Sequence, residues 1–212
     1  MRPDFDDCFP LRLSRVHEVC GPGAIAFAAI AAPPEGPILW LREAWRSDML
    51  NPSGLLPFLD PSRLLLAKSP GQIDSLAVAE EALRDGAIPV VILEITKPLN
   101  LREGRRLQLA AGTGGTIGLC IIPEEMGSNA AETRWRAAPV LDGGQQDSTL
   151  MRWEIIKNKS GTHGAWNVRW DTETRNLHVV SPAGQRPGPA RARLRVPLRW
   201  SASRTTPTAC PA

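Results

Sequence analysis

Strongly apolar runs that alternate with helix-like segments are the feature that most constrains the fold of this chain. The strand-like runs are residues 37–41, 63–67, 87–95 and 116–122, and the helix-like segments are 24–32, 69–86 and 101–111. Strands that are apolar on both faces are typical of a parallel sheet buried between helices. We therefore predict an α/β fold with a doubly wound, mostly parallel sheet flanked by helices.

The C-terminal part of the chain has a different pattern, in which apolar and charged residues are mixed. The segments concerned are 133–140, 151–157, 165–171 and 177–180. This pattern predicts antiparallel edge strands with one solvent-facing side, which extend the parallel sheet. The same segments contain Trp135, Trp153, Trp166 and Trp170. These tryptophans are interpreted either as the edge of the core or as a partly exposed docking surface, because tryptophan is frequent in protein interfaces.

Residues 182–212 differ from the rest of the chain in composition. They contain six of the 25 basic residues and none of the 22 acidic ones, so the preceding part carries 19 basic against 22 acidic residues. The segment is also rich in proline and has little periodicity. We predict one domain over residues 1–181, followed by a flexible Pro/Arg-rich tail at 182–212.

Two groups of arginines are candidate contacts for DNA or for a protein partner. The tail contributes Arg191, Arg193 and Arg195, together with Trp200. Arginine binds phosphates and tryptophan stacks on bases, so these residues suit DNA as well as an acidic protein. The second group is Arg102, Arg105 and Arg106, which fall on one predicted helix. The alternative for both groups is a solvated surface without a partner.

The turn after the first predicted strand is the place where a nucleotide-binding loop would lie. Strand 13–20 ends at Gly21, Pro22 and Gly23, and a helix follows at once. Ligands of open α/β sheets bind beyond the carboxyl ends of the strands. A working phosphate loop needs a lysine for the phosphates and a hydroxyl for magnesium, and residues 21–32 contain no Lys, Ser or Thr. Gly21 and Gly23 are therefore predicted to form a degenerate phosphate loop or a simple tight turn.

Two carboxylates stand near the ends of other predicted strands. Glu94 follows the apolar run 90–93, where an acid would hold magnesium, and Glu43 follows the second strand, where a carboxylate would activate water. Without a phosphate loop neither carboxylate has a nucleotide to act on. The alternative is that each binds neighbouring backbone or arginine. We therefore predict a protein without enzymatic activity, catalytic residues or cofactor.

Metal chemistry and membrane insertion are not indicated by this sequence. His17, His163 and His178 have no partners at metal-ligand spacing, so no metal site is predicted. The four cysteines are scattered, which is typical of a reducing compartment. The sequence has neither a signal peptide nor a long apolar run, so a cytoplasmic protein is expected.

A family resemblance is carried by several segments in a fixed order. They are HEVCGPG at 17–23, PILWLRE at 37–43, the segment 60–95, GRRLQLAAGTGGTIGLCII at 104–122, AETRWRAAPV at 131–140 and MRWEIIKNKSG at 151–161. Together these segments resemble the RecA fold family and, within it, the ImuA family, over about residues 13–180. Lys157 and Lys159 resemble the lysine-bearing turn of RecA, which makes them candidate contacts for a partner or for DNA. The missing phosphate loop departs from RecA, and the acidic segment 123–132 is unlike a DNA-binding loop.

The resemblance implies a RecA-like fold and a function in damage-induced (SOS) translesion DNA synthesis. An ImuA-like protein is expected to act as an adapter without chemistry of its own. Its expected partner is an ImuB-like homologue of the Y-family polymerases, with RecA as a second partner and an error-prone replicative-type polymerase reached indirectly. DNA contact is expected through the basic tail. Two alternatives stay open, a SulA-like inhibitor of cell division and a DNA-dependent ATPase of the RecA class.

Overall fold

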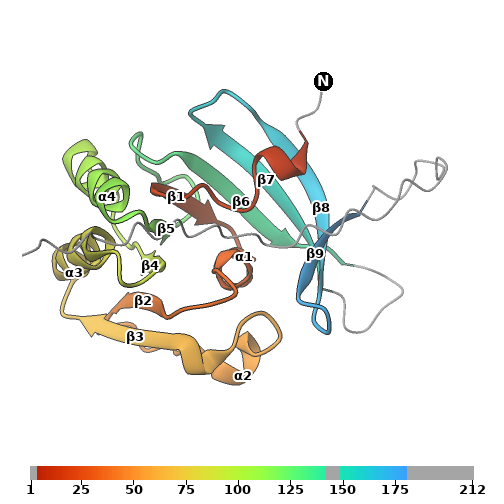
Figure 1. Cartoon of the computed structure of the whole chain (residues 1–212), viewed down its shortest axis with the longest axis horizontal. Coiled ribbons are helices and arrows are strands. Elements are labelled where there is room, and N and C mark those ends of the chain that lie inside the picture. The colour runs from red at the N-terminus through yellow and green to blue at the C-terminus, as the bar shows by residue number, and fades with distance from the viewer. Residues whose placement is uncertain (1–3, 142–148, 181–212) are drawn as a thin grey trace, which may run out of the picture.

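The computed structural model describes residues 4–141 and 149–180, which form one mixed sheet with helices on both faces (Figure 1). The helices are η1 (Phe5–Asp7), α1 (Ala24–Ala31), α2 (Pro52–Leu55), η2 (Pro61–Arg63), α3 (Gln72–Asp85) and α4 (Leu101–Gly114). The strands are β1 (Arg15–Cys20), β2 (Ile38–Glu43), β3 (Leu64–Ser69), β4 (Val90–Glu94), β5 (Ile117–Ile121), β6 (Thr133–Pro139), β7 (Leu150–Asn158), β8 (Gly164–Asp171) and β9 (Asn176–Val180). Within these residues, no helix has the length and apolar character that a membrane span requires.

The nine strands lie in the order β3-β2-β4-β5-β1-β6-β7-β8-β9. All neighbouring pairs from β3 to β6 are parallel, and β6 through β9 pair in antiparallel fashion. The predicted mostly parallel sheet with a C-terminal antiparallel extension is therefore confirmed. The central position of β4 and β5 agrees with their apolar sequences, because both faces of these strands are buried.

The prediction that the C-terminal segments are edge strands is wrong for β6, β7 and β8. Each of the three is hydrogen-bonded on both sides, and β6 also pairs in parallel with β1, with Val19 opposite Trp135. The mixed sequence pattern has another cause. In β6, the side chains of Trp135 and Ala137 are fully buried while Arg136 on the other face is exposed. One face of this part of the sheet is in solvent, which gives the alternation expected of an edge strand at interior positions.

Two hydrophobic cores lie on opposite faces of the sheet. On one face, α3 and α4 pack on the parallel strands through Leu83, Leu107 and other buried side chains. On the other face, α1 and the N-terminal segment pack on the centre of the sheet and on the antiparallel strands. Figure 1 shows α3 and α4 lying together over the parallel part, away from the long curved strands β7 and β8.

An aromatic cluster joins the N-terminal segment to the antiparallel strands. The ring of Phe27 in α1 lies 4.4 Å from that of Trp153 and 5.4 Å from that of Trp135, centroid to centroid. Phe9 adds an edge-on contact with Trp153 at 5.2 Å. Trp135 and Trp153 are fully buried and Trp170 is nearly so. The interpretation of these tryptophans as core residues is therefore confirmed, and that of an exposed docking surface is wrong for these three.

Local capping fixes where the two long helices, α3 and α4, begin and end, and one close backbone contact joins their C-terminal ends. Asn100 and Glu103 form a capping box at the start of α4, in which each side chain accepts a hydrogen bond from the other residue's backbone N–H. Both helices end at a left-handed glycine, Gly86 and Gly115. A Cβ atom at Gly114 would lie 2.0 Å from the Leu83 carbonyl oxygen, so glycine at this position lets the helix ends meet.

Candidate functional site

The carboxyl edge of the parallel strands brings together the residues of the predicted degenerate nucleotide site. Strand register places Val19 opposite Ile121 and Ile121 opposite Glu94, so the ends of β1, β5 and β4 lie side by side, with β5 between Gly21 and Glu94. Glu43 ends β2 at the same edge. Side chains alternate between the two faces of a strand. Arg42, which is next to Glu43, lies beside Glu94, so the two glutamates point to opposite faces and do not converge on one ligand position.

The turn after β1 packs directly on the backbone of β6. Gly21 has a φ angle of 91°, and a Cβ atom there would lie 2.5 Å from the Ala137 carbonyl oxygen. The backbone N–H of Gly23 donates a hydrogen bond of 2.9 Å to the same oxygen, and that of Ala24 bonds the Gly21 carbonyl at 3.0 Å. Two of the N–H groups that would hold a phosphate at a helix N-terminus are therefore used within the protein.

Glu94 is the centre of a buried ionic network on the face of α1. Nε of Arg42 lies 2.7 Å from Oε1 of Glu94, and Nη1 of Arg46 lies 2.7 Å from Oε2. The Arg42 contact does not meet hydrogen-bond geometry, so its attraction is mainly Coulombic. The indole N–H of Trp40 donates a hydrogen bond of 2.8 Å to the same carboxylate. Glu94 thus binds arginine, in agreement with the alternative prediction that this carboxylate contacts neighbouring arginine and does not hold magnesium.

Asp48 completes this network from the loop after β2. Its Oδ2 atom accepts a hydrogen bond of 2.6 Å from Nη2 of Arg42, and its carbonyl oxygen accepts one of 2.8 Å from Nη1. Arg46 donates two more hydrogen bonds to the same carboxylate. The hydrogen bonds from Arg46, followed by those from Arg42, lower the pKa of Asp48 to about 2. Nothing in the sequence singles out Asp48, because it lies in an irregular segment without a motif.

Glu43 anchors an exposed tryptophan on the opposite face. Its carboxylate accepts a hydrogen bond of 2.7 Å from the indole N–H of Trp45 and another from the hydroxyl of Thr96. Burial acts to raise the pKa of Glu43, but the two hydrogen bonds and the positive charges of Lys97 and Arg46 together outweigh it, and the pKa lies below its ordinary value. Trp45 itself is 66% exposed. This residue was not among the predicted contacts, although a tryptophan in a polar segment directly after a strand was a usable signal.

Comparison with known proteins supports the resemblance found in the sequence. No protein-family model matches the chain. Protein ImuA from two strains of Caulobacter vibrioides is 29% identical in sequence, in an alignment that covers 77% of this chain and 79% of ImuA. The chain is similar to ImuA over most of the length of both proteins. The RadB recombinase has a similar structure, with a TM-score of 0.57 and 13% identity, covering 80% of this chain and 92% of RadB, so the RecA-like fold is confirmed.

The carboxyl edge of the parallel strands in this chain does not fit a nucleotide with magnesium. The segment 21–32 has neither the lysine nor the hydroxyl that such a complex requires. The N–H groups of Gly23 and Ala24 are bonded to carbonyl oxygens of the protein. Glu94, in the position of a magnesium ligand, is held by two guanidinium groups.

The two lysines that resemble the RecA turn stabilise a loop of their own chain. Nζ of Lys157 donates hydrogen bonds to the carbonyl oxygens of Ser128, Asn129 and Ala131, at 2.7 to 3.1 Å. Nζ of Lys159 donates one of 2.6 Å to the Ala130 carbonyl. Burial lowers the pKa of Lys157. Both lysines lie near the start of β6, away from the carboxyl edge.

The three predicted arginines of α4 lie on its exposed face. Arg106 forms an ion pair of 2.6 Å with Glu80 of α3, whereas Arg102 and Arg105 have no ion-pair partner among the residues described. The predicted tail at 182–212 lies outside the residues that the structure describes. Its candidate contacts, which therefore have no structural account, are Arg191, Arg193, Arg195 and Trp200.

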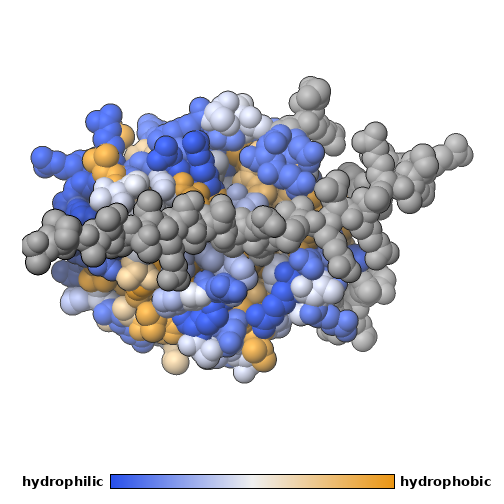
Figure 2. Space-filling model, viewed as in Figure 1, coloured by the Kyte–Doolittle hydropathy of each residue, from blue (hydrophilic) through white to orange (hydrophobic). Residues whose placement is uncertain are grey.

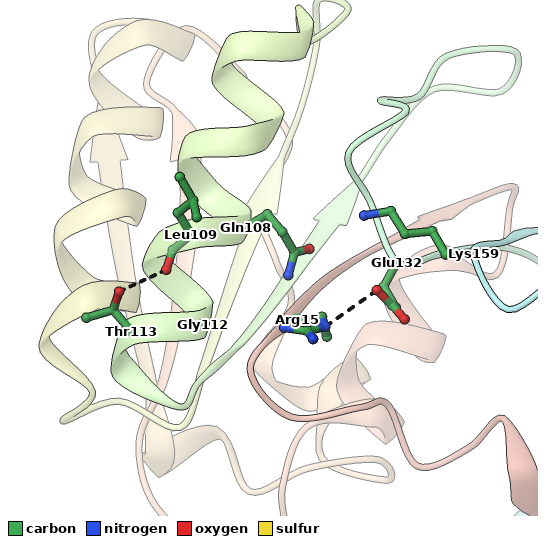
Figure 3. A pocket seen from close by; sticks show the side chains of 7 residues that line it. All are labelled: Arg15, Gln108, Leu109, Gly112, Thr113, Glu132 and Lys159. Carbon is green, nitrogen blue, oxygen red and sulfur yellow. Dashed lines mark hydrogen bonds and ion pairs between the residues drawn. The ribbon is translucent and has the colours of Figure 1, made fainter.

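Lys159 and α4 meet at a cleft of about 540 Å³ (Figure 3). The cleft is lined by Arg15, Gln108, Leu109, Gly112, Thr113, Glu132 and Lys159. The sequence predicted candidate contacts on the arginine-bearing helix and on the lysine turn. The structure places these two segments next to each other at this cleft.

Proposed function

We propose that this ImuA relative is a non-catalytic adapter of damage-induced translesion DNA synthesis. Its direct partner is an ImuB-like homologue of the Y-family polymerases, and an error-prone replicative-type polymerase is reached through that partner. RecA is a second partner, and the tail is the site of any DNA contact. The likeness to ImuA supports the pathway. The observation that carries the non-catalytic role is the pairing of Glu94 with Arg42 and Arg46 in a RecA-like sheet.

The energetics of this network argue against a catalytic site. Breaking a buried ion pair by removing one partner costs about 3–5 kcal/mol, because a buried charge is left uncompensated. A magnesium ion at Glu94 would have to displace two guanidinium groups, and the Arg42 side chain is only 3% exposed. The arrangement therefore favours a structural use of the acid.

The loop 123–132 argues against recombinase-like DNA binding, because it is acidic and its polar groups are bound within the protein. The backbone N–H of Ser128 donates a hydrogen bond of 2.6 Å to the buried Glu18, which also pairs with Arg134 at 2.8 Å. Lys157 and Lys159 hold the carbonyl oxygens of the same loop. The loop is thus tied to the protein by its polar groups.

Co-purification tests the adapter proposal. The full-length chain is tagged and purified with the ImuB-like protein and the RecA of the same organism. Retention of the ImuB-like protein is expected, and loss of both partners with and without damaged DNA would refute the proposal. Filamentation of cells that overproduce the chain would instead favour a division inhibitor.

Nucleotide turnover is tested on the same preparation. We expect no magnesium-dependent release of phosphate from ATP, with or without single-stranded DNA. Turnover that co-elutes with the chain and depends on magnesium would favour the ATPase alternative. RecA, measured in parallel, shows that the assay detects activity.

A further inference from the structure

The cleft beside α4 is a preformed feature with walls from distant parts of the chain. The Gln108 side chain accepts a hydrogen bond of 3.1 Å from the Val16 backbone N–H, which joins α4 to β1. The backbone N–H of Lys159 donates one of 3.0 Å to the Glu132 carbonyl. Figure 3 shows Arg15 and Glu132 facing α4 across the cleft, with Lys159 above them.

The surface around the cleft has an excess of positive charge. Of the residues that line the cleft, Arg15 and Lys159 are cationic and Glu132 is acidic. On the adjoining face of α4, Arg102 and Arg105 are exposed and have no ion-pair partner among the residues described. This contrasts with residues 1–181 as a whole, in which acidic residues outnumber basic ones. The charge is therefore local and is suited to a partner with carboxylates or phosphates.

Apolar side chains on α4 favour a protein as the partner. Leu109 at the cleft is 72% exposed and Leu101, two turns earlier on α4, is 48% exposed. Arg105 lies midway between them, so the three share one face of the helix. In Figure 2, hydrophobic residues lie among hydrophilic ones in the region of α4. A nucleic-acid backbone gains nothing from exposed leucines, whereas an apolar side chain of a protein segment packs on them.

We infer that this cleft and the outer face of α4 dock an acidic segment of a protein partner that also carries apolar side chains. Carboxylates of the segment pair with Arg102, Arg105 and Lys159, while an apolar side chain packs on Leu109. The inference rests on the proposed adapter function, because it assigns a surface to the partner of that function.

The test uses two probes of equal length on the full chain labelled with ¹⁵N. One is a synthetic 18-residue peptide with leucines and glutamates on the same helical face, and the other is an 18-nucleotide oligo(dT). Amide shifts in α4 and at Lys159 are followed for wild type, R102E/R105E and L109S. The matched control is K68E/R152E, which changes the same number of charges at exposed positions elsewhere.

We expect the peptide to shift α4 amides in wild type and in the control, with affinity at least tenfold weaker in R102E/R105E and in L109S. Oligo(dT) that shifts these amides in place of the peptide would overturn the inference in favour of nucleic acid. The inference would also be overturned if neither the peptide nor oligo(dT) shifted the amides. Binding of the ImuB-like protein is measured with the same variants, so absence of that binding in wild type refutes the adapter function separately.

Discussion

The carboxylate of Glu94 lies 2.7 Å from Nε of Arg42, and both side chains are 3% exposed. Replacing Glu94 with Gln removes the buried carboxylate that Arg42 and Arg46 share and leaves them only the more exposed Asp48. We expect E94Q to lower the free energy of unfolding by about 3–5 kcal/mol, measured by urea denaturation. The control E35Q, at an exposed position, should change it by less than about 0.5 kcal/mol. If E94Q also changed the free energy of unfolding by less than about 0.5 kcal/mol, the ion pairs of Glu94 would not stabilise the fold.

The turn at Gly21 should not tolerate a side chain. G21A combines a left-handed φ of 91° with a contact of 2.5 Å to the Ala137 carbonyl. G115A has a similar φ of 70° but open space around the added atom. We expect G115A to cost about 1 kcal/mol from backbone strain alone, and G21A clearly more. Equal thermal stabilities of the two variants would mean that the β6 contact is unimportant.

His17 should make stability depend on pH. The Nε2 of His17 donates a hydrogen bond to the Arg12 carbonyl, and its Nδ1 lies 2.7 Å from the Thr133 hydroxyl, from which it accepts when the ring is neutral. Burial lowers the pKa of His17 from 6.5 to about 4, although the Arg12 hydrogen bond opposes this. The unfolded chain binds the proton more readily, so stability is complete above pH 6.5 and falls by about 3 kcal/mol as the pH drops to 4.

Unfolding of wild type and H17Q across this pH range checks the effect of His17. The slope between about pH 4.5 and 6.5 should be smaller in H17Q, because the titrating group is gone. H178Q is the control, since His178 is exposed, and it should keep the wild-type slope. An unchanged slope in H17Q would assign the pH dependence to other groups.

Lys157 should control the order of the loop at 128–131. K157M removes three hydrogen bonds to carbonyl oxygens of that loop. We expect faster amide exchange at these residues and a loss of about 1–3 kcal/mol in the free energy of unfolding. K68M, at an exposed position of β3, should leave the amide exchange of the loop and the free energy of unfolding unchanged. Unaltered exchange in K157M would show that the lysine is free for another role.

The order of strands and helices could be read from the sequence, because burial on one or both faces leaves a local periodic pattern. The absence of a lysine and hydroxyls at 21–32 was also visible there. The interior position of β6 could not be predicted from the sequence. One solvent-facing side gives an interior strand the same alternation of apolar and polar residues as an edge strand.

The sequence by itself therefore determined the fold class and the loss of the phosphate loop's chemical groups. Only the tertiary structure decided that Glu94 pairs with Arg42, that Gly21 packs on Ala137 and that Lys159 lies beside α4. These contacts join segments that are distant along the chain. They depend on strand order and register, which a local pattern does not encode.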